Sequence, residues 1–339
     1  MSPSEYTAMI FLCQHIFSIL SLSFNVFLIY LIITKSPKQL DAYKYLMIFI
    51  SLFEMVHSTL ESFLGPLIMS YGPSFIILHT TKHSILPEVV LRILNLTHWG
   101  LYGSALAMFA VHFVYRYASM TGKSIVKPSK PYLTILWFIP TIATFLVCIL
   151  VSYLTTSPRD WLTLSLINSV YDNFGIRSGE FDYFGLNIYE MKNGDLSTIS
   201  LHYRDLSCAV IYSIIMSISL WIIIVFGWKC YHSLSLLINC SNTSKQYRKL
   251  QAQLFYSLII QTLIPFIFLI FPCFYTAFLA VINSDATYMN GILSISISIY
   301  PLIDPLPTIF IVKHYRLAVL KLLPCCRHIQ QKPSAIESK

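Results

Sequence analysis

Seven long apolar segments divide this sequence, and they limit its fold more than any other feature. They cover residues 9–33, 45–69, 93–115, 132–153, 206–228, 254–282 and 288–312. A helix needs about 20 largely apolar residues to cross the hydrocarbon core of a bilayer, and each segment is long enough. Five of the seven contain no Asp, Glu, Lys or Arg. The sequence therefore predicts an all-α bundle of seven transmembrane helices.

The overall composition excludes a water-soluble globular protein. Hydrophobic residues make up 56% of the chain and charged residues 11%, against roughly 25% charged residues in an ordinary soluble domain. A chain of this length can bury only part of so much apolar surface inside itself, and the remainder must face lipid.

The positions of the basic residues predict the orientation in the membrane. Of the 23 Lys and Arg residues, 17 fall in the first, third and fifth connectors or in the C-terminal tail. Short connectors that are rich in Lys and Arg stay on the cytoplasmic side. Because the number of spans is odd, we expect an extracellular N-terminus and a cytoplasmic tail, in a multi-pass protein of the plasma membrane.

One connector is much longer than the others and lies on the predicted outer side. Residues 154–205 contain seven acidic side chains and a series of aromatic ones, namely Trp161, Tyr171, Phe174, Phe181, Tyr183, Phe184 and Tyr189. A connector of this length is usually functional or disordered. Two interpretations are open: a packed lid over the bundle, or a loosely ordered loop that aids solubility.

The segment 314–323, after the seventh span, predicts a short amphipathic helix on the inner leaflet. Its apolar and basic positions at helical spacing are Leu317, Leu320, Leu323, Arg316 and Lys321. Residues 1–323 would then form the transmembrane domain and residues 324–339 a cytoplasmic tail. Cys325 and Cys326 begin that tail and are either palmitoylation sites, as juxtamembrane cysteines often are, or free thiols.

Three polar residues share one face of the second span. Glu54, His57 and Glu61 are spaced at i, i+3 and i+7, which places them on the same side of a helix. A carboxylate at mid-membrane costs roughly 2.5–3.5 kcal/mol on insertion scales, so these side chains must face the bundle interior or a wet cavity. They form either an ion site, a proton relay or a ligand contact, or a structural hydrogen-bond network with protonated carboxyls.

The sixth and seventh spans combine prolines with polar residues. Asp304 lies within a run that holds Pro301, Pro305 and Pro307. Prolines inside a helix remove backbone donors and bend or loosen it, so Asp304 is either a switch element or a cap at a fixed kink. In the sixth span, Pro265 and Pro272 likewise predict a bend, with Gln261 as an interior polar contact.

Both ends of the third span carry candidate functional residues. The inner end reads His112-Phe-Val-Tyr-Arg-Tyr117, and its Arg116 either extends to the lipid headgroups or turns inward to a partner. Toward the outer end, His98, Trp99 and Tyr102 either line a ligand cavity or belong to the aromatic belt that is common at membrane interfaces.

Several chemistries are excluded by the residues themselves. The seventh span has no lysine before Lys313, so a retinal Schiff base there is ruled out. The sequence contains no nucleophile turn, phosphate-binding glycine loop or histidine cluster with metal-ligand spacing. Despite the net charge of +8, the basic connectors have no nucleic-acid-binding motif. We therefore expect no enzymatic activity, no cofactor, no metal and no nucleic-acid partner.

Several motifs, in the right order over nearly the whole chain, resemble the nematode serpentine chemoreceptors of the Str group. The most specific are Leu250-Gln-Ala-Gln-Leu-Phe255 leading to Gln261-Thr-Leu-Ile-Pro265, and Tyr300-Pro-Leu-Ile-Asp-Pro-Leu-Pro-Thr-Ile-Phe310 followed by His314-Tyr-Arg316. The string His112–Tyr117 and the segments Lys35-Ser-Pro-Lys38 and Tyr43-Lys-Tyr-Leu-Met47 add to the likeness. The resemblance implies a seven-helix G-protein-coupled receptor displayed on sensory cilia.

The resemblance also implies roles for particular residues. A small odorant or soluble chemical would bind in the outer half of the bundle, and the candidate contacts there are His98, Trp99, Tyr102, Glu61 and Gln261. Coupling to a heterotrimeric G protein would involve the inner-end residues His112, Tyr115, Arg116, Tyr117, Asp304 and Pro305. Glu54 and His57 would form an intramembrane polar network.

The chain departs from general rhodopsin-like receptors in two ways. Tyr115 replaces the acid that usually precedes the arginine, and no acid occurs from Lys229 through Ile282, so an ion pair between the third and sixth helices cannot form. No cysteine occurs between Tyr71 and Thr97 or between Leu154 and Asp205, so the usual disulfide from the third helix to the outer loop is absent.

The sequence thus predicts a chemosensory receptor that binds a small molecule and activates a G protein. The rival from another class is a ligand-gated channel or ion-coupled transporter that uses Glu54, His57 and Asp304 as an ion path. Transporters commonly contain repeated halves, and no internal repeat is visible here. A further alternative is a receptor-like chain that serves as an orphan trafficking or partner subunit.

Overall fold

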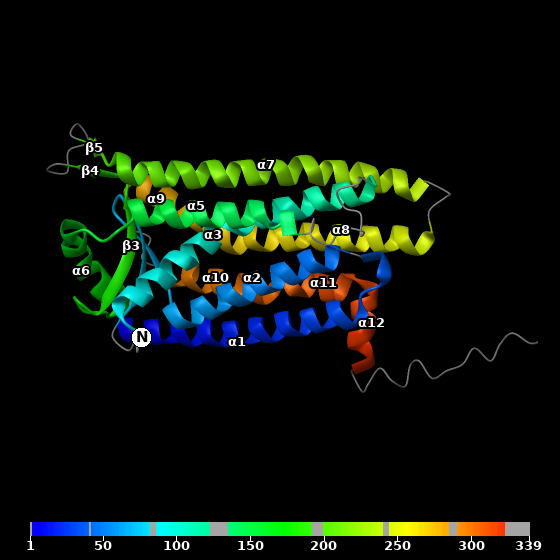
Figure 1. Cartoon of the computed structure of the whole chain (residues 1–339). Helices are drawn as coiled ribbons and strands as arrows, with labels where there is room; N and C mark the ends of the chain where they lie inside the picture. The colour runs from blue at the N-terminus through cyan, green and yellow to red at the C-terminus, as the bar shows by residue number, and fades with distance from the viewer. Residues whose placement is uncertain are drawn as a thin grey trace, which may run out of the picture.

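The computed structural model describes residues 2–40, 42–81, 86–122, 135–191, 199–239, 244–284 and 290–322 of the chain. Within them, seven helical segments run side by side along one axis (Figure 1). In chain order these are α1 (Pro3–Lys35), α2 (Tyr43–Leu64), α3 (Glu88–Met120), α5 (Ile139–Thr155), α7 (Tyr203–Asn239), a sixth segment of α8 (Lys245–Pro265), η5 (Phe266–Ile270) and α9 (Phe271–Val281), and a seventh of α10 (Asn290–Ile303) and α11 (Pro305–Ile311). This is the predicted seven-helix bundle.

Most of the described helical segments have the length and apolar composition of a membrane span, and α3 packs in their midst. α1, α2, α7, the sixth segment and the seventh are each long and apolar enough to cross a membrane, and α5 passes together with α6 (Asp160–Phe174), to which it is bent by 97°. α3 is the central helix, packed against α2, α5, α7 and α8. Its His98, His112 and Arg116 are at most 4% exposed. Polar side chains that face the bundle interior avoid lipid, so a central helix can carry them.

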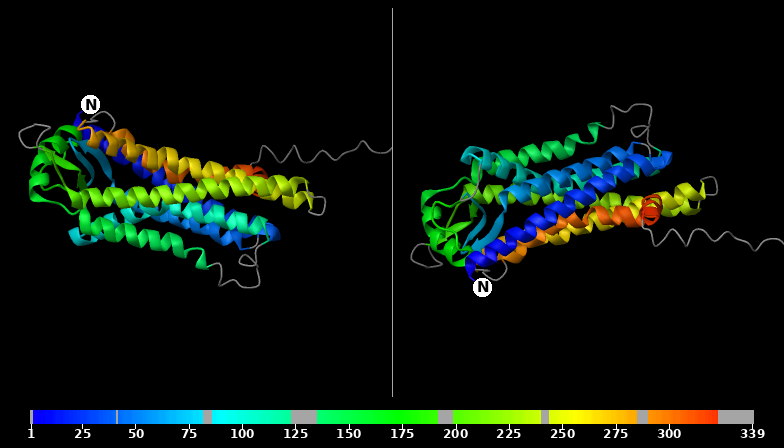
Figure 2. Two further views of the ribbon diagram at one scale, coloured as in Figure 1. Left: turned by 90° about the horizontal axis from the view of Figure 1, so that it is seen from above. Right: turned by 90° about the horizontal axis from the view of Figure 1, so that it is seen from below.

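A small β-sheet and α6 close the end of the bundle that carries the N-terminus (Figures 1 and 2). Strands β1 (Leu67–Tyr71), β2 (Ser74–Thr80) and β3 (Phe181–Asn187) pair antiparallel in that order, and β4 (Tyr189–Met191) pairs with β5 (Ile199–Leu201). We call β1, β2, α6 and β3 the outer lid, because the positions of the basic residues predict that this end of the bundle lies outside the cell. Phe174, Tyr183 and Phe184 are at most 2% exposed within it. The described part of the long connector is therefore a packed lid.

The second helix ends before the predicted boundary at residue 69. It stops at Leu64, and Gly65 follows in the left-handed conformation with φ 52°. Glycine adopts that conformation without a side-chain penalty and commonly terminates helices, and Pro66 cannot continue the ladder because it lacks an N–H. The apolar residues that follow, 67–69, lie in β1.

Prolines interrupt the sixth and seventh segments. Beyond Pro265, residues Phe266–Ile270 form a π-helical turn before α9 starts, with Pro272 near its first residue. In the seventh segment, α10 ends at Ile303 and α11 begins at Pro305, with Asp304 at the break. A missing N–H donor shifts or breaks the hydrogen-bond ladder, which accounts for both interruptions.

The opposite end of the bundle carries two short helices. η1 (Lys38–Leu40) joins α1 to α2, and α12 (Lys313–Leu322) turns across the bundle where the amphipathic helix was expected (Figure 1). Tyr315 of α12 is fully buried, and its hydroxyl lies 2.8 Å from Ser36 Oγ. Cys325, Cys326 and the rest of the tail lie outside the described residues.

Gly103 allows α3 to pack closely against α5 and α7. A Cβ at this position would lie 2.4 Å from Cys148 Sγ and 2.9 Å from the Tyr212 ring. Gly103→Ala should therefore destabilise the purified protein by about 1–3 kcal/mol, the usual cost of overpacking, measured by thermal unfolding. Gly227→Ala is the matched control, because its Cβ would meet Phe113 at an ordinary 3.4 Å. Equal stability of both variants would contradict this interpretation.

Candidate functional site

A cavity of about 130 Å³ lies in the outer half of the bundle, beneath the outer lid. We call it the outer cavity. Its walls are aromatic, aliphatic and sulfur-bearing, and they include Trp99 and Tyr102 of α3, Tyr212 and Met216 of α7, Cys273 and Ala277 of α9, Phe75 of β2 and Leu186 of β3. An apolar cavity of roughly 150 Å³ can hold benzene, so the outer cavity suits a small organic molecule.

Few polar groups border the outer cavity, and most of them are occupied. The Tyr102 hydroxyl donates to the Leu269 carbonyl at 2.6 Å and contacts Cys273 Sγ. The Tyr212 hydroxyl lies 2.9 Å from Ser152 Oγ. The Trp99 indole N–H, by contrast, has no hydrogen-bond partner among the described residues. A buried donor without a partner costs free energy, which a ligand that brings an acceptor would recover.

His98 and Glu61 lie beside the outer cavity rather than in its wall. They border a separate void of about 10 Å³, and Tyr102 borders both spaces. His98 Nε2 lies 3.1 Å from Glu61 Oε2, and the Ser298 hydroxyl donates to Glu61 Oε1 at 2.6 Å. These contacts join α2, α3 and α10. Of the five predicted ligand residues, Trp99 and Tyr102 thus line the outer cavity, and His98 and Glu61 adjoin it.

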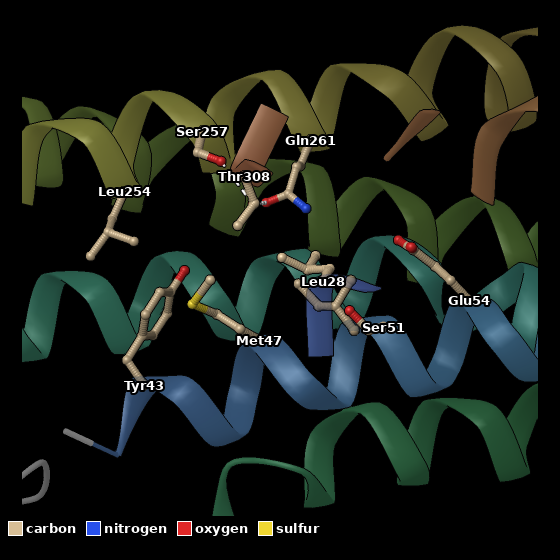
Figure 3. A pocket seen from close by; sticks show the side chains of 10 residues that line it. Leu28, Tyr43, Met47, Ser51, Glu54, Leu254, Ser257, Gln261 and Thr308 are labelled. Carbon is tan, nitrogen blue, oxygen red and sulfur yellow. Dashed lines mark hydrogen bonds between the residues drawn. The ribbon is translucent and has the colours of Figure 1, made fainter. Parts of the chain in front are cut away.

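Gln261 lies elsewhere, in a polar network with Ser257 and Thr308 (Figure 3). Its amide donates to Asp304 Oδ2 at 2.9 Å and to the Asp304 carbonyl at 3.0 Å, and its oxygen accepts from the Thr308 hydroxyl at 3.0 Å. The Ser257 hydroxyl lies 2.9 Å from that of Thr308. These bonds connect α8 to the break between α10 and α11, where the backbone ladder is interrupted.

Glu54 borders the same network from α2 (Figure 3). It is fully buried, and neither carboxyl oxygen makes a hydrogen bond of normal geometry with the described residues. Its electrostatic neighbours are Asp304 and Asn25. Asn25 itself donates to the Pro301 carbonyl at 3.2 Å. The structure therefore brings two predicted carboxyl residues together, although they are far apart in the sequence.

Arg116 turns inward at the inner end of α3. It is 1% exposed, its guanidinium donates to the Gln251 carbonyl of α8 at 3.1 Å, and it lies 4.8 Å from the Tyr43 ring centroid. The bond to the Gln251 carbonyl joins α3 to α8. No acidic residue takes part in it, and α8 contains none. Of the two interpretations of Arg116, extension to the headgroups is therefore wrong for this conformation.

The neighbours of Arg116 form an aromatic cluster. Tyr43 lies 5.7 Å from His112 and 5.6 Å from Tyr115, and Tyr115 lies 5.2 Å from Trp137, all between ring centroids. Tyr117 faces α7 instead, with its ring centroid 5.6 Å from that of Phe226. Pro305 is the first residue of α11. The inner-end candidates are therefore spread over the α2–α3, α3–α7 and α10–α11 contacts.

The outer lid is attached through an ion pair that the sequence did not reveal. The Arg159 guanidinium contacts the Asp205 carboxylate, and the backbone N–H of Asn187 donates to the same carboxylate at 2.7 Å. On the other side of the lid, the Thr7 hydroxyl donates to the Phe174 carbonyl at 2.8 Å. The cysteines among the described residues are free thiols, so non-covalent contacts hold this part of the lid.

Known proteins resemble this chain in both sequence and fold. A family model described as serpentine type 7TM GPCR chemoreceptor Str matches residues 10–320. This chain belongs to the Str family of seven-transmembrane chemoreceptors. The Str receptor is 31% identical to the G-protein coupled receptor str-217 of Caenorhabditis elegans over 91% of its own length and 88% of the relative's. It is 24% identical to the serpentine receptor class r-10 of the same species, over 88% of its own length and 86% of that relative's.

The fold of this Str receptor is that of the rhodopsins. Squid rhodopsin in its crystal structure superimposes with a TM-score of 0.57 over 96% of this chain and 89% of that one, at 14% sequence identity. An identity this low supports the fold alone. Together with the family match, the likeness of fold confirms a multi-pass membrane receptor of the GPCR class, which is not an enzyme. The rival interpretation as a channel or transporter gains no support from these relatives, which are named as receptors.

Proposed function

We propose that this Str receptor binds a small, mainly apolar molecule in the outer cavity and activates a heterotrimeric G protein at its inner end. It would act in the plasma membrane of sensory cilia, with the N-terminus outside. The main support is the outer cavity, which combines apolar walls, a volume of about 130 Å³ and the Trp99 N–H, which has no hydrogen-bond partner in the described part of the chain. These properties suit a volatile or sparingly soluble compound with one hydrogen-bond acceptor.

A route from the outer cavity to the inner end supports the coupling half of the proposal. Tyr102 borders the cavity and donates to the carbonyl of Leu269, within the π-helical turn. Further inward along the same segment, the Gln261 amide donates a hydrogen bond to Asp304, and the Gln251 carbonyl accepts one from Arg116. A ligand that displaces Tyr102 would act on the least regular turn of the sixth segment and could thereby release the contact between α8 and Arg116.

A competing space is less suitable for a signalling ligand. A groove of about 830 Å³ runs between α7 and α8 nearer the inner end. Its residues Trp228, Ile224 and Leu263 are at least 50% exposed on the outside of the bundle. In a bilayer such an apolar surface faces acyl chains, so we assign the groove to lipid.

The proposal is tested by filling the outer cavity. A chemical panel applied to cells that express the chain with a promiscuous G protein and a calcium reporter would first identify agonists. Ala277→Phe should then reduce the response to these agonists at least tenfold, because the ring takes up much of the cavity. Leu263→Phe adds the same ring to the lipid-facing side of the same segment and should respond normally. Unchanged responses in Ala277→Phe, at equal surface expression, would overturn the assignment.

A further inference from the structure

Two histidines and a glutamate meet between α2 and α3, where the sequence predicted no metal site. One ligand atom each from His57, Glu61 and His98 lies within 4.8 Å of the other two. His98 Nε2 is 3.1 Å and His57 Nδ1 is 3.8 Å from the same oxygen, Glu61 Oε2. The sequence alone does not indicate this site because its residues come from two helices. Only His57 and Glu61, both on α2, are close together in the sequence.

We propose that His57, Glu61 and His98 bind a divalent transition-metal cation of the class that includes Zn²⁺ and Cu²⁺. Two imidazoles and one carboxylate form a common three-residue donor set for zinc, with a fourth position left for water or another ligand. Imidazole also suits copper and nickel, whereas Mg²⁺ and Ca²⁺ prefer sites made of oxygen atoms.

The unpaired nitrogens of His57 argue for an occupant. The ring is fully buried, and neither nitrogen has a hydrogen-bond partner among the described residues. Its neighbours are the His98 ring, 4.8 Å away between centroids, and the edge-on Tyr300 ring at 5.4 Å. A buried polar ring without partners costs free energy. Coordination of Nδ1 would satisfy the side of the ring that faces Glu61.

The distances are close to those that coordination requires. Metal–ligand bonds of about 2.0–2.2 Å in a tetrahedral site place ligand atoms about 3.3–3.6 Å apart. The pairs at 3.1 and 3.8 Å nearly meet this requirement. The ligand atoms of His57 and His98 lie up to 4.8 Å apart, so His57 must move by on the order of 1 Å to complete the set. The carboxylate is already oriented, because the Ser298 hydroxyl donates to its other oxygen at 2.6 Å. Such outer-shell hydrogen bonds hold ligands in place at metal sites.

A small void adjoins two of the three ligands. It has a volume of about 10 Å³, is bordered by Glu61 and His98 but not by His57, and has room for roughly one water-sized occupant. Tyr102 separates it from the outer cavity, since this side chain lines both spaces. The carboxylate supplies one negative charge against the two of the cation, so the site needs no further acid. Once bound, the ion would link α2 to α3 and, through Ser298, to α10.

Direct metal binding by the whole purified chain in lipid nanodiscs is the test, and it does not depend on any signalling activity. Titration with ZnCl₂ against a competing chelator should give one tight ion per chain. Co²⁺ should give the visible absorption bands of a four-coordinate site with nitrogen and oxygen ligands. His57→Ala and His98→Ala should each weaken Zn²⁺ binding at least tenfold, and Ser298→Ala, which removes only the outer-shell hydroxyl, about 10–100-fold.

The control is His232→Ala, which removes an exposed histidine on α7 and should bind Zn²⁺ like the unaltered chain. Glu61→Gln serves where an alanine variant does not fold, because it keeps the shape and removes the charge. Binding that is equal in the unaltered chain, His57→Ala and Glu61→Gln would overturn the proposal. Loss of the tight ion in His232→Ala would also overturn it, since the ion would then lie on the surface.

Discussion

Replacing Arg116 with alanine is expected to abolish G-protein signalling while the receptor still reaches the cell surface. The guanidinium is buried at the inner end of α3 and bonds to the carbonyl of Gln251 on α8. In the proposed mechanism α3 and α8 separate on activation, and the same group then becomes available to the G protein. Alanine provides neither the hydrogen bond to the Gln251 carbonyl nor the positive charge. The measurement is agonist-evoked calcium release alongside surface labelling of the same cells.

Two further variants separate this role from a general effect of charge. Lys35→Ala removes an exposed cation from the end of α1 and should signal normally. Arg116→Lys keeps the charge but loses the planar array of donors, so we expect partial signalling. Full signalling by Arg116→Ala at normal expression would rule out a role for this residue in coupling.

Replacing Arg159 with alanine is expected to lower the free energy of unfolding of the purified receptor by about 3–5 kcal/mol, the typical cost of removing one partner from a buried ion pair. Asp205 is completely buried at its side chain, whereas Arg159 retains 19% exposure. The remaining carboxylate would therefore have lost its counter-charge away from water. Thermal unfolding and limited proteolysis of the outer lid both measure the effect.

A double-mutant cycle identifies the cause of that loss. Asp205→Asn removes the charge but keeps an oxygen that can accept from the Asn187 N–H, a bond of 2.7 Å in the present structure. The combined variant Arg159→Ala with Asp205→Asn should be more stable than Arg159→Ala alone, because no isolated charge stays buried. If the combined variant is no more stable than Arg159→Ala alone, the unpaired charge is not the cause.

The spans could be predicted from the sequence because a bilayer imposes a length and an apolar composition on each helix. The end of the second span could not, because the β1 residues 67–69 are as apolar as the helix before them. Only Gly65 and Pro66 indicated the turn. In the same way, spacing could not decide whether Arg116 faces lipid headgroups or the bundle, since the answer depends on α8 and Tyr43.

The candidate site shows the same limit. Helical periodicity placed Glu54, His57 and Glu61 on one face, and the structure buries all three. Their partners His98 and Asp304 come from other helices, and no local pattern in a single sequence connects them. Gln261 was expected among the ligand contacts, yet it bonds to Asp304. Contacts between distant segments depend on how the helices pack, which only the fold determines.

The π-helical turn at Phe266–Ile270 also sets the angular register of the sixth segment. A π turn accommodates one more residue than an α turn, and each residue of an α-helix accounts for about 100° of rotation. If the same five residues wound as a regular α-helix, Cys273 and Ala277 would rotate by about 100° away from the cavity wall, while Gln251 and Gln261 keep their places. The π turn therefore determines which side chains of α9 face the outer cavity, independently of the part of the segment that contacts Arg116.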